Sequence, residues 1–122
     1  MTVYAGSIDK TETGQGNRCS CKVGSGGVTA GDSVYLSADK TVVICTDKAD
    51  ECYGVALDTI SADGYVTVLR TGCLVLVPVT LTVGVYVQPE HGGTGGWEDF
   101  TDGTKVAIVE TGASSASQIR LL

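Results

Sequence analysis

Short apolar runs recur at one fixed spacing along this chain, and this repetition constrains the fold more than any other feature. Shifting the sequence by 51 residues, without a gap, places Val34-Tyr35-Leu36 on Val85-Tyr86-Val87. The same shift places Val55-Ala56-Leu57 on Val106-Ala107-Ile108. Several matches at one offset, each a short apolar run, indicate a duplicated unit.

Length and composition limit what the duplicated unit can build. The 122 residues suffice for one domain, so both copies must share one core. There are 17 glycines and 2 prolines, Val and Thr are frequent, and no long stretch has helical spacing. We predict an all-β fold: a small β-barrel or sandwich built from two tandem half-barrel repeats, about residues 28–72 and 79–122, which close together because neither buries a face alone.

Eight apolar runs bounded by turn residues predict the strands. They are Ser33–Ser37, Thr41–Thr46, Tyr53–Ile60, Tyr65–Thr71, Cys73–Val79, Gly84–Gln88, Thr104–Thr111 and Gln118–Leu122. The turns "SADK" and "SADG" supply an Asp followed by a residue that tolerates or leads into a left-handed position, which suits tight hairpins. Pro78 cannot donate a ladder hydrogen bond, so its strand is expected at an edge or a bulge.

Residues 1–27 are polar and rich in glycine, with a possible short strand only around Cys21–Val23. We predict an extended N-terminal arm here, followed by one β domain over residues 28–122. An extended chain of this length reaches up to roughly 80 Å and can add a strand to the sheet of a partner. A disordered leader is the alternative.

The charge and hydropathy of the chain argue against several classes of partner. The net charge is −6, and the eight basic residues are scattered, which disfavours nucleic acid. No apolar run is long enough for a membrane span, and the first residues lack the pattern of a signal peptide, so we expect synthesis in the cytoplasm.

Five cysteines lack the paired spacing of zinc sites, so no metal site is predicted. Cys45 and Cys52 flank one short loop, and a disulfide between them would close a hairpin there if their Cα atoms lie close enough. Cytoplasmic synthesis disfavours that bridge. The acidic loops "DKADE" and "EDFTD" do not match a calcium-binding loop, and solvated surface loops are the simpler interpretation.

The Gly-rich loop 89–103 holds the single histidine, His91, and the single tryptophan, Trp97. A catalytic role would need His91 beside a nucleophile, and an exposed loop histidine is the simpler interpretation. The "HGGTGG" stretch lacks the Lys and helix of a phosphate loop. Trp97 and Phe100 are either interface anchors or, for Trp97, a plug at the open end of the barrel.

The order of these motifs resembles a known family. "TAGDSVYL", then "YGVAL" with a small-residue turn, then a Val-rich strand ending in "RTG" is similar to the small capsid cement, or decoration, proteins of tailed double-stranded DNA phages. The resemblance covers roughly residues 28–122 and implies a β-barrel or sandwich with an N-terminal arm. The five cysteines and the long Gly-rich loop depart from the usual pattern of that family.

The resemblance implies a structural virion protein without enzymatic activity, cofactor or small-molecule substrate. It implies that the chain binds the outer surface of the capsid, often as a homotrimer, and staples neighbouring copies of the major capsid protein. The predicted partner contacts are Val3, Tyr4, Ile8, Trp97 and Phe100. An adhesion module of a phage tail or fibre, which binds a receptor or host surface through "EHGGTGGW", is the alternative; a small hydrolase built on His91 is a weaker third hypothesis.

Overall fold

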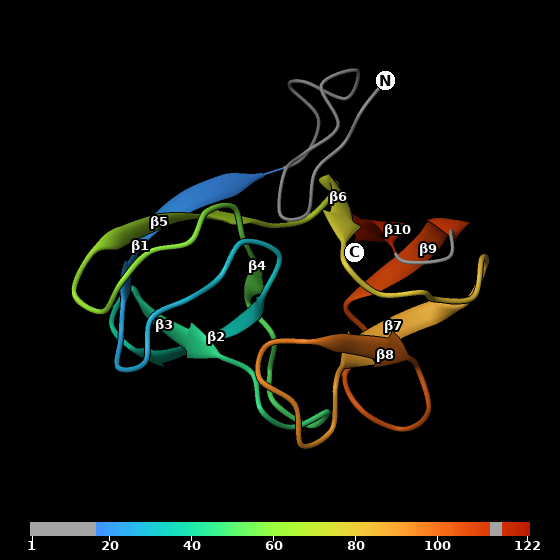
Figure 1. Cartoon of the computed structure of the whole chain (residues 1–122), viewed down its shortest axis with the longest axis horizontal. Helices are drawn as coiled ribbons and strands as arrows, with labels where there is room; N and C mark the ends of the chain where they lie inside the picture. The colour runs from blue at the N-terminus through green and yellow to red at the C-terminus, as the bar shows by residue number, and fades with distance from the viewer. Residues whose placement is uncertain (1–16, 113–115) are drawn as a thin grey trace.

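The computed structural model describes residues 17–112 and 116–122, and these form ten β-strands and no helix (Figure 1). The strands are β1 Arg18–Val23, β2 Ser33–Ala38, β3 Thr41–Ile44, β4 Gly54–Ala56, β5 Tyr65–Leu69, β6 Leu74–Val77, β7 Tyr86–Pro89, β8 Trp97–Asp99, β9 Ala107–Gly112 and β10 Ser117–Leu121. The all-β prediction is therefore confirmed. No stretch of the described residues is a helix long and apolar enough to cross a lipid bilayer.

The first half of the chain closes into a five-stranded barrel with the strand order β1-β3-β2-β4-β5. Strand β1 pairs antiparallel with β5 at five positions, from Arg18 opposite Leu69 to Lys22 opposite Tyr65. It also pairs in parallel with β3, where Val23 lies opposite Val42. This parallel contact removes both free edges of the sheet, which is what closes the barrel.

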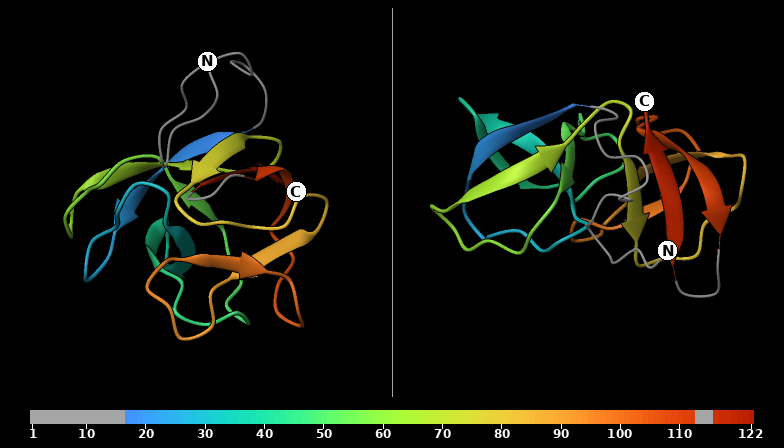
Figure 2. Two further views of the ribbon diagram at one scale, coloured as in Figure 1. Left: turned by 45° about the vertical axis from the view of Figure 1, so that its right-hand side comes forward. Right: turned by 90° about the horizontal axis from the view of Figure 1, so that it is seen from above.

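The second half forms a separate five-stranded sheet in the order β6-β10-β9-β7-β8. Each strand of this sheet has the place of its counterpart in the barrel: β6 lies beside β10 as β1 lies beside β5, and β8 lies beside β7 as β3 lies beside β2. The two halves lie side by side (Figure 2). The duplication is thus present in the topology, and the predicted small β-barrel or sandwich is confirmed, as a closed barrel in the first half with a second sheet beside it.

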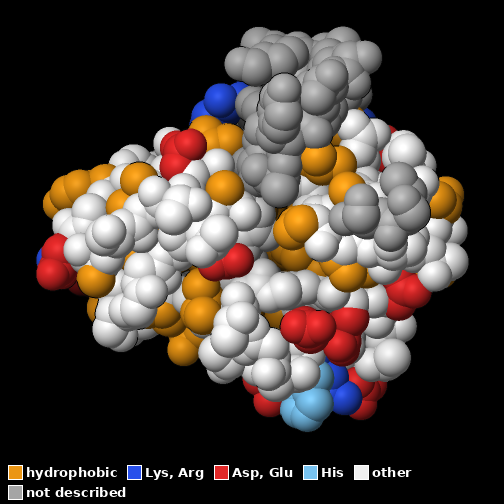
Figure 3. Space-filling model, viewed as in Figure 1, with side chains coloured by type: hydrophobic (Ala, Val, Ile, Leu, Met, Phe, Trp, Pro, Cys, Tyr) orange, Lys and Arg blue, Asp and Glu red, His pale blue; other side chains and the backbone are white. Residues whose placement is uncertain are grey.

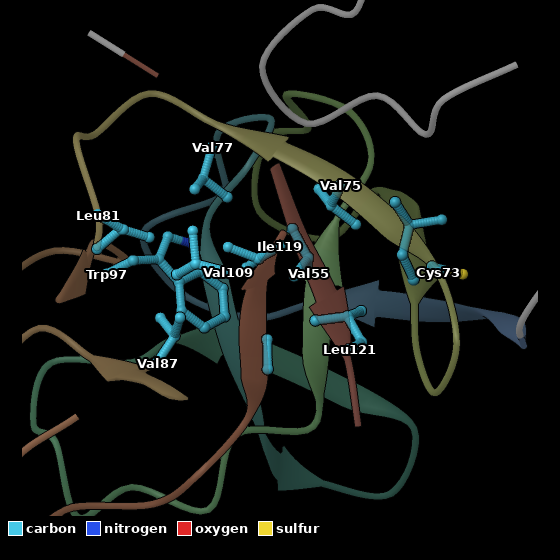
Figure 4. Packing of buried hydrophobic residues seen from close by; sticks show 12 residues of the cluster. Val55, Cys73, Val75, Val77, Leu81, Val87, Trp97, Val109, Ile119 and Leu121 are labelled. Atoms are coloured by element: carbon cyan, nitrogen blue, oxygen red, sulfur yellow. The ribbon is translucent and has the colours of Figure 1, made fainter. Parts of the chain in front are cut away.

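Each half has its own buried hydrophobic cluster, and the cluster of the second half also contains side chains from the first half. Inside the barrel lie small side chains such as Cys21, Val34, Val42 and Val68. The other cluster covers one face of the second sheet and also includes Val55 and Leu69 of the first half. Figure 4 shows Val55 among the side chains of that sheet. Adjacent residues therefore face opposite sides of the barrel wall: Ala56 and Val68 belong to the barrel interior, and their neighbours Val55 and Leu69 to the joint with the second sheet.

All eight predicted strands are present with shifted ends, and two further strands were not among the eight. The first is β1, of which we had expected only a possible short strand around Cys21–Val23. From Arg18 onward, the stretch we assigned to an arm belongs to the barrel, because the side chains of β1 alternate: Cys19, Cys21 and Val23 turn inward while Arg18, Ser20 and Lys22 are exposed. The second is β8, a strand of only three residues inside the Gly-rich loop.

The ungapped offset of 51 residues is right for only part of the duplication. Val68 of β5 does correspond to Ile119 of β10, since both are fully buried and both pair with the first strand of their own half. The offset of 51 residues would make Val85 the counterpart of Val34. However, Val34 lies opposite β4, and the residue in the same position opposite β9 is Val87, not Val85. Loop lengths between the strands differ, so each strand pair has its own offset.

The turn prediction holds for the first turn and is one residue off in the second. Lys40, which follows Asp39, has φ 47° as expected, whereas in the second turn Asp63 itself has φ 70° and takes the left-handed position. Strand β6 lies at the edge of its sheet and ends at Val77, so Pro78 withdraws no donor from a ladder.

Candidate partner-binding surface

The Gly-rich loop joins the two halves through its backbone. The N–H of Ser33 donates to the carbonyl of Gly95 at 2.8 Å, and the N–H of Gly95 donates to the carbonyl of Cys45 at 2.8 Å. Gly95 has φ 84°, and a Cβ there would lie 2.6 Å from the side chain of Asp32, so glycine is required at this close approach. The backbone of this loop is therefore occupied inside the molecule.

Trp97 lies at the centre of this joint. Its side chain is 2% exposed and packs among Leu81, Val87 and Val109 (Figure 4). Its indole N–H donates to the carbonyl of Gly31 in the first half at 2.8 Å. The structure thus buries Trp97 in the cluster between the halves, and its side chain is not on the surface.

Charged side chains hold the outer part of the same loop. Lys48 Nζ lies 2.7 Å from Asp102, and His91 Nδ1 lies 3.6 Å from Asp47. We call these four residues the charged latch; acidic, basic and histidine side chains gather at this edge of the molecule (Figure 3). The hydrogen bond from Lys48 lowers the pKa of the Asp102 carboxyl, and the N–H of Ala49 is the main cause of the lowered pKa of Asp47.

Aromatic rings and two cations lie on both sides of the joint between the halves. We call Tyr53, Arg70, Tyr86, Phe100 and Lys105 the basic seam. Tyr53 immediately precedes β4 and Arg70 immediately follows β5, so the antiparallel pairing of β4 with β5 brings the two together.

Arg70 is fixed against Tyr53 in two ways. Its Nε–H donates to the carbonyl of Tyr53 at 2.9 Å, and its guanidinium carbon lies 3.9 Å from the centre of the Tyr53 ring. The Cys19 sulfur lies 3.6 Å from the Tyr53 hydroxyl, and this contact, followed by burial, raises the pKa of Tyr53. The phenol therefore remains neutral at physiological pH and presents its ring face to the guanidinium.

On the second half, Lys105 lies over aromatic rings as Arg70 does on the first. Its ammonium lies 4.7 Å from the centre of the Tyr86 ring and 5.2 Å from that of Phe100. The fully buried Gln88 positions this segment, because its side-chain oxygen accepts the N–H groups of Thr101 and Gly103. A buried amide on β7 thus holds the chain that connects Phe100 to Lys105.

Two neighbouring grooves run along the seam, and both are lined by Cys52, Tyr53 and Arg70. The larger has a volume of about 500 Å³ and extends toward the exposed Leu36, with Asp50 and Glu51 also in its wall. The smaller, of about 100 Å³, is lined from the first half by Gly54, Arg70 and Thr71 and from the second half by Lys105, Val106, Leu121 and Leu122. The smaller groove therefore exists only where both halves meet.

The two cations of the seam are set apart by the aromatic rings beneath them, because Arg18 and Lys40 also have no carboxylate within 4.0 Å among the described residues. Lys22, Lys48 and Arg120 each have a carboxylate within 4.0 Å. Neither Arg70 nor Lys105 has such a partner among residues 17–112 and 116–122. Both cations are held over aromatic rings instead, which leaves their charge available to a ligand.

The cysteines are all free thiols in the described chain. Cys45 and Cys52 are neighbours: a hydrogen bond between their thiols, together with burial, raises the pKa of Cys52 well above its usual range. The disulfide between them stays a prediction, which a mass measurement with and without a thiol reagent tests. Burial also raises the pKa of the Cys21 thiol to about 11, and its sulfur lies 3.9 Å from that of Cys19.

The structure places the predicted contact residues in different settings. Phe100 is half-buried and belongs to the basic seam, whereas Trp97 is core. Val3, Tyr4 and Ile8 lie outside the described residues. Sequence reasoning did not single out Arg70, Lys105 or Tyr53, because only the folded arrangement shows which basic residues lack a carboxylate and lie over rings.

Comparison with known proteins identifies the fold. No protein-family model matches the chain, and no curated protein matches it. Among solved structures, the crystal structure of the head fiber gp8.5 N base in bacteriophage phi29 is similar, with a TM-score of 0.62 and 13% sequence identity, over 87% of this chain and 93% of that one. The chain therefore has the fold of that phage head fibre base along nearly its whole length.

Proposed function

We propose that this chain is a structural protein of a tailed phage that binds the outer surface of the capsid. The observation that carries the proposal is the likeness of fold to a phage head fibre base, which extends over 87% of this chain. The resemblance of its motifs to capsid decoration proteins supports the same role by an independent route. The partner under this proposal is the major capsid protein.

The proposed mechanism is adhesion without any bond making or breaking. Each copy makes a modest interface with the shell, and many copies on one lattice multiply the total strength of attachment. Homotrimerisation, which we also propose, would add buried area at the threefold positions of the lattice. Residues 1–16, which precede the barrel, are the proposed arm that reaches a neighbouring capsid subunit.

A tail or fibre adhesion module remains the alternative, with "EHGGTGGW" as its contact. The geometry of this loop counts against it, because Gly95 and Trp97 are engaged inside the molecule. Labelling of particles with an antibody against this chain separates the two proposals: signal over the capsid supports the first, and signal confined to the tail contradicts it.

Co-sedimentation with expanded capsid shells tests the proposed function directly. The purified full chain should pellet with the shells at a defined copy number, and a chain that begins at residue 17 should bind far more weakly. Cutting at residue 17 leaves β1 and the barrel complete, so the comparison reports on the arm and not on folding. Failure of the full chain to bind would contradict the function, and equal binding by the truncated chain would remove the arm from the mechanism.

A further inference from the structure

We propose that the basic seam is a docking site for carboxylate side chains on the surface of a protein partner. The inference deepens the proposed function, since it rests on the capsid as the partner and names the contact face and its chemistry. Three observations carry it: two cations without a carboxylate partner in the described chain, their fixed position over aromatic rings, and a groove that both halves are needed to form.

Arg70 has the geometry to receive a carboxylate. Its Nε–H is already used by the carbonyl of Tyr53, and its terminal amino groups make no hydrogen bond within the described residues. The stacked Tyr53 ring holds the guanidinium in place, so little side-chain entropy is lost when a ligand binds. Planar guanidinium and carboxylate groups then form two parallel hydrogen bonds.

Lys105 supplies a second positive charge in the wall of the same small groove. The surrounding rings of Tyr53, Tyr86 and Phe100 belong, with arginine, to the residue types that dominate the energy of protein interfaces. These rings would also keep water away from the ion pair between the Lys105 ammonium and the partner's carboxylate, and a lower local dielectric strengthens the attraction between the two charges. An acidic side chain flanked by apolar residues on the partner would complement this surface.

The charge balance of the chain favours a protein carboxylate over nucleic acid. Two adjacent cations on a protein of net charge −6 cannot follow a phosphate backbone, which needs an extended row of basic groups. Asp50 and Glu51 in the wall of the larger groove would repel phosphates further. Arg70 lines both grooves, but only the smaller one also holds Lys105 and lacks Asp50 and Glu51, so we place the partner carboxylate in the smaller groove.

Four variants, one of them a control, test the docking site on expanded capsid shells. Arg70→Gln and Lys105→Gln remove one charge each at nearly constant size, and Lys40→Asn is the matched control, because it removes one charge at an exposed turn that lines neither groove and where Asn tolerates the positive φ. We expect affinity to fall by about tenfold for Arg70→Gln and about threefold for Lys105→Gln, with no change for Lys40→Asn. Arg70→Lys, which keeps the charge but loses the bidentate geometry, should lie between the wild type and Arg70→Gln.

Unchanged affinity in both seam variants would overturn the docking site while leaving the proposed function intact. A loss of affinity counts only if the thermal unfolding temperature of the variant matches the wild type. Blocking the carboxylates of the shell by amidation should also weaken the wild type and should not weaken Arg70→Gln further.

A test without capsid separates the site from the function. Titration with a polyglutamate peptide, followed by NMR at the seam, should show binding that Arg70→Gln weakens about tenfold, even if the chain does not bind shells. Polyglutamate that binds the variant as well as the wild type would overturn the inference. Equal or tighter binding of duplex DNA at the same residues would assign the site to phosphate and overturn it as well.

Discussion

The two halves of the chain have the same strand order but different closure. In the first half, β2 turns directly into β3 through Asp39 and Lys40, and β3 reaches β1 in parallel. In the second half, the Gly-rich loop separates β7 from β8, and its backbone bonds to the first half instead. No pairing joins β6 to β8 in the described chain, so this sheet stays open.

The side chains at one equivalent position account for part of this difference. Val42 pairs with Leu36 in the barrel, and Trp97 pairs with Pro89 in the second sheet at the same place in the topology. A valine fits inside a five-stranded barrel, whereas an indole needs more room and finds its hydrogen-bond partner, Gly31, in the other half. The comparison shows that one ancestral topology can give a self-contained barrel and a sheet that depends on its neighbour.

The largest expected effect comes from removing the Trp97 side chain, which ties the second half to the first through its packing and its hydrogen bond to Gly31. Trp97→Ala leaves a cavity in the second cluster and removes the hydrogen bond to Gly31, so it should cost about 3–5 kcal/mol of the free energy of unfolding. Denaturant titration measures it. Trp97→Phe, which keeps much of the volume, should recover part of the loss; no difference between the two variants would contradict the packing role.

Leu69→Ala tests whether the open sheet relies on the barrel. Leu69 points into the joint, so its truncation should cost about 2–5 kcal/mol. Hydrogen exchange should show the loss of protection mainly in β9 and β10. Its neighbour Val68 faces the barrel interior, and Val68→Ala should instead expose the amides of β1 and β3. The same pattern of exchange in both variants would mean that the halves unfold as one unit.

Two glycines of the loop make a paired test of the backbone contact between the halves. Both Gly95 and Gly92 have positive φ, so alanine costs roughly 1–2 kcal/mol at either position from backbone strain. Only at Gly95 would the new Cβ meet Asp32, and Gly92 has nothing within 4 Å. Gly95→Ala should therefore be the more destabilising by denaturant titration, by about 1 kcal/mol or more. Equal effects would show that the loop can move away from Asp32.

The charged latch should contribute least, and its contribution should depend on pH. The pKa of Asp102 is lowered from its ordinary value of 3.8 by Lys48, so the pair stabilises the folded state above pH 3.8 and this stabilisation is lost as the pH falls through the lower folded value. Asp102→Asn should slightly lower the thermal unfolding temperature at pH 7. The wild type and the variant should converge in strong acid; a gap that widens toward low pH would contradict this assignment.

Much of the fold could be predicted from local patterns. The eight runs around residues such as Val55, Val75 and Val87 are short, apolar and bounded by turn residues, so each forms a strand in almost any β context. β1 could not be predicted with the same ease, because its inward positions are cysteines in a polar stretch. β8 has only three residues, too few to show alternation.

The candidate site depended almost entirely on contacts between distant residues. Phe100 was predicted as a partner contact, but its position beneath Lys105 could not be derived from the sequence. Trp97 was equally suited by chemistry to a core or an interface, and only its neighbours show that it is buried. Arg70 became a candidate because Tyr53, 17 residues away, lies under its guanidinium.

The sequence by itself determined the all-β class, most strands, the left-handed turns and the duplication, because strand periodicity and turn chemistry act over a few neighbouring residues. The tertiary structure alone decided which half closes, where Trp97 lies and which cations lack a carboxylate. These outcomes depend on free-energy differences between alternative long-range packings: a valine or an indole at one position, and a loop bonded to its own sheet or to the other half.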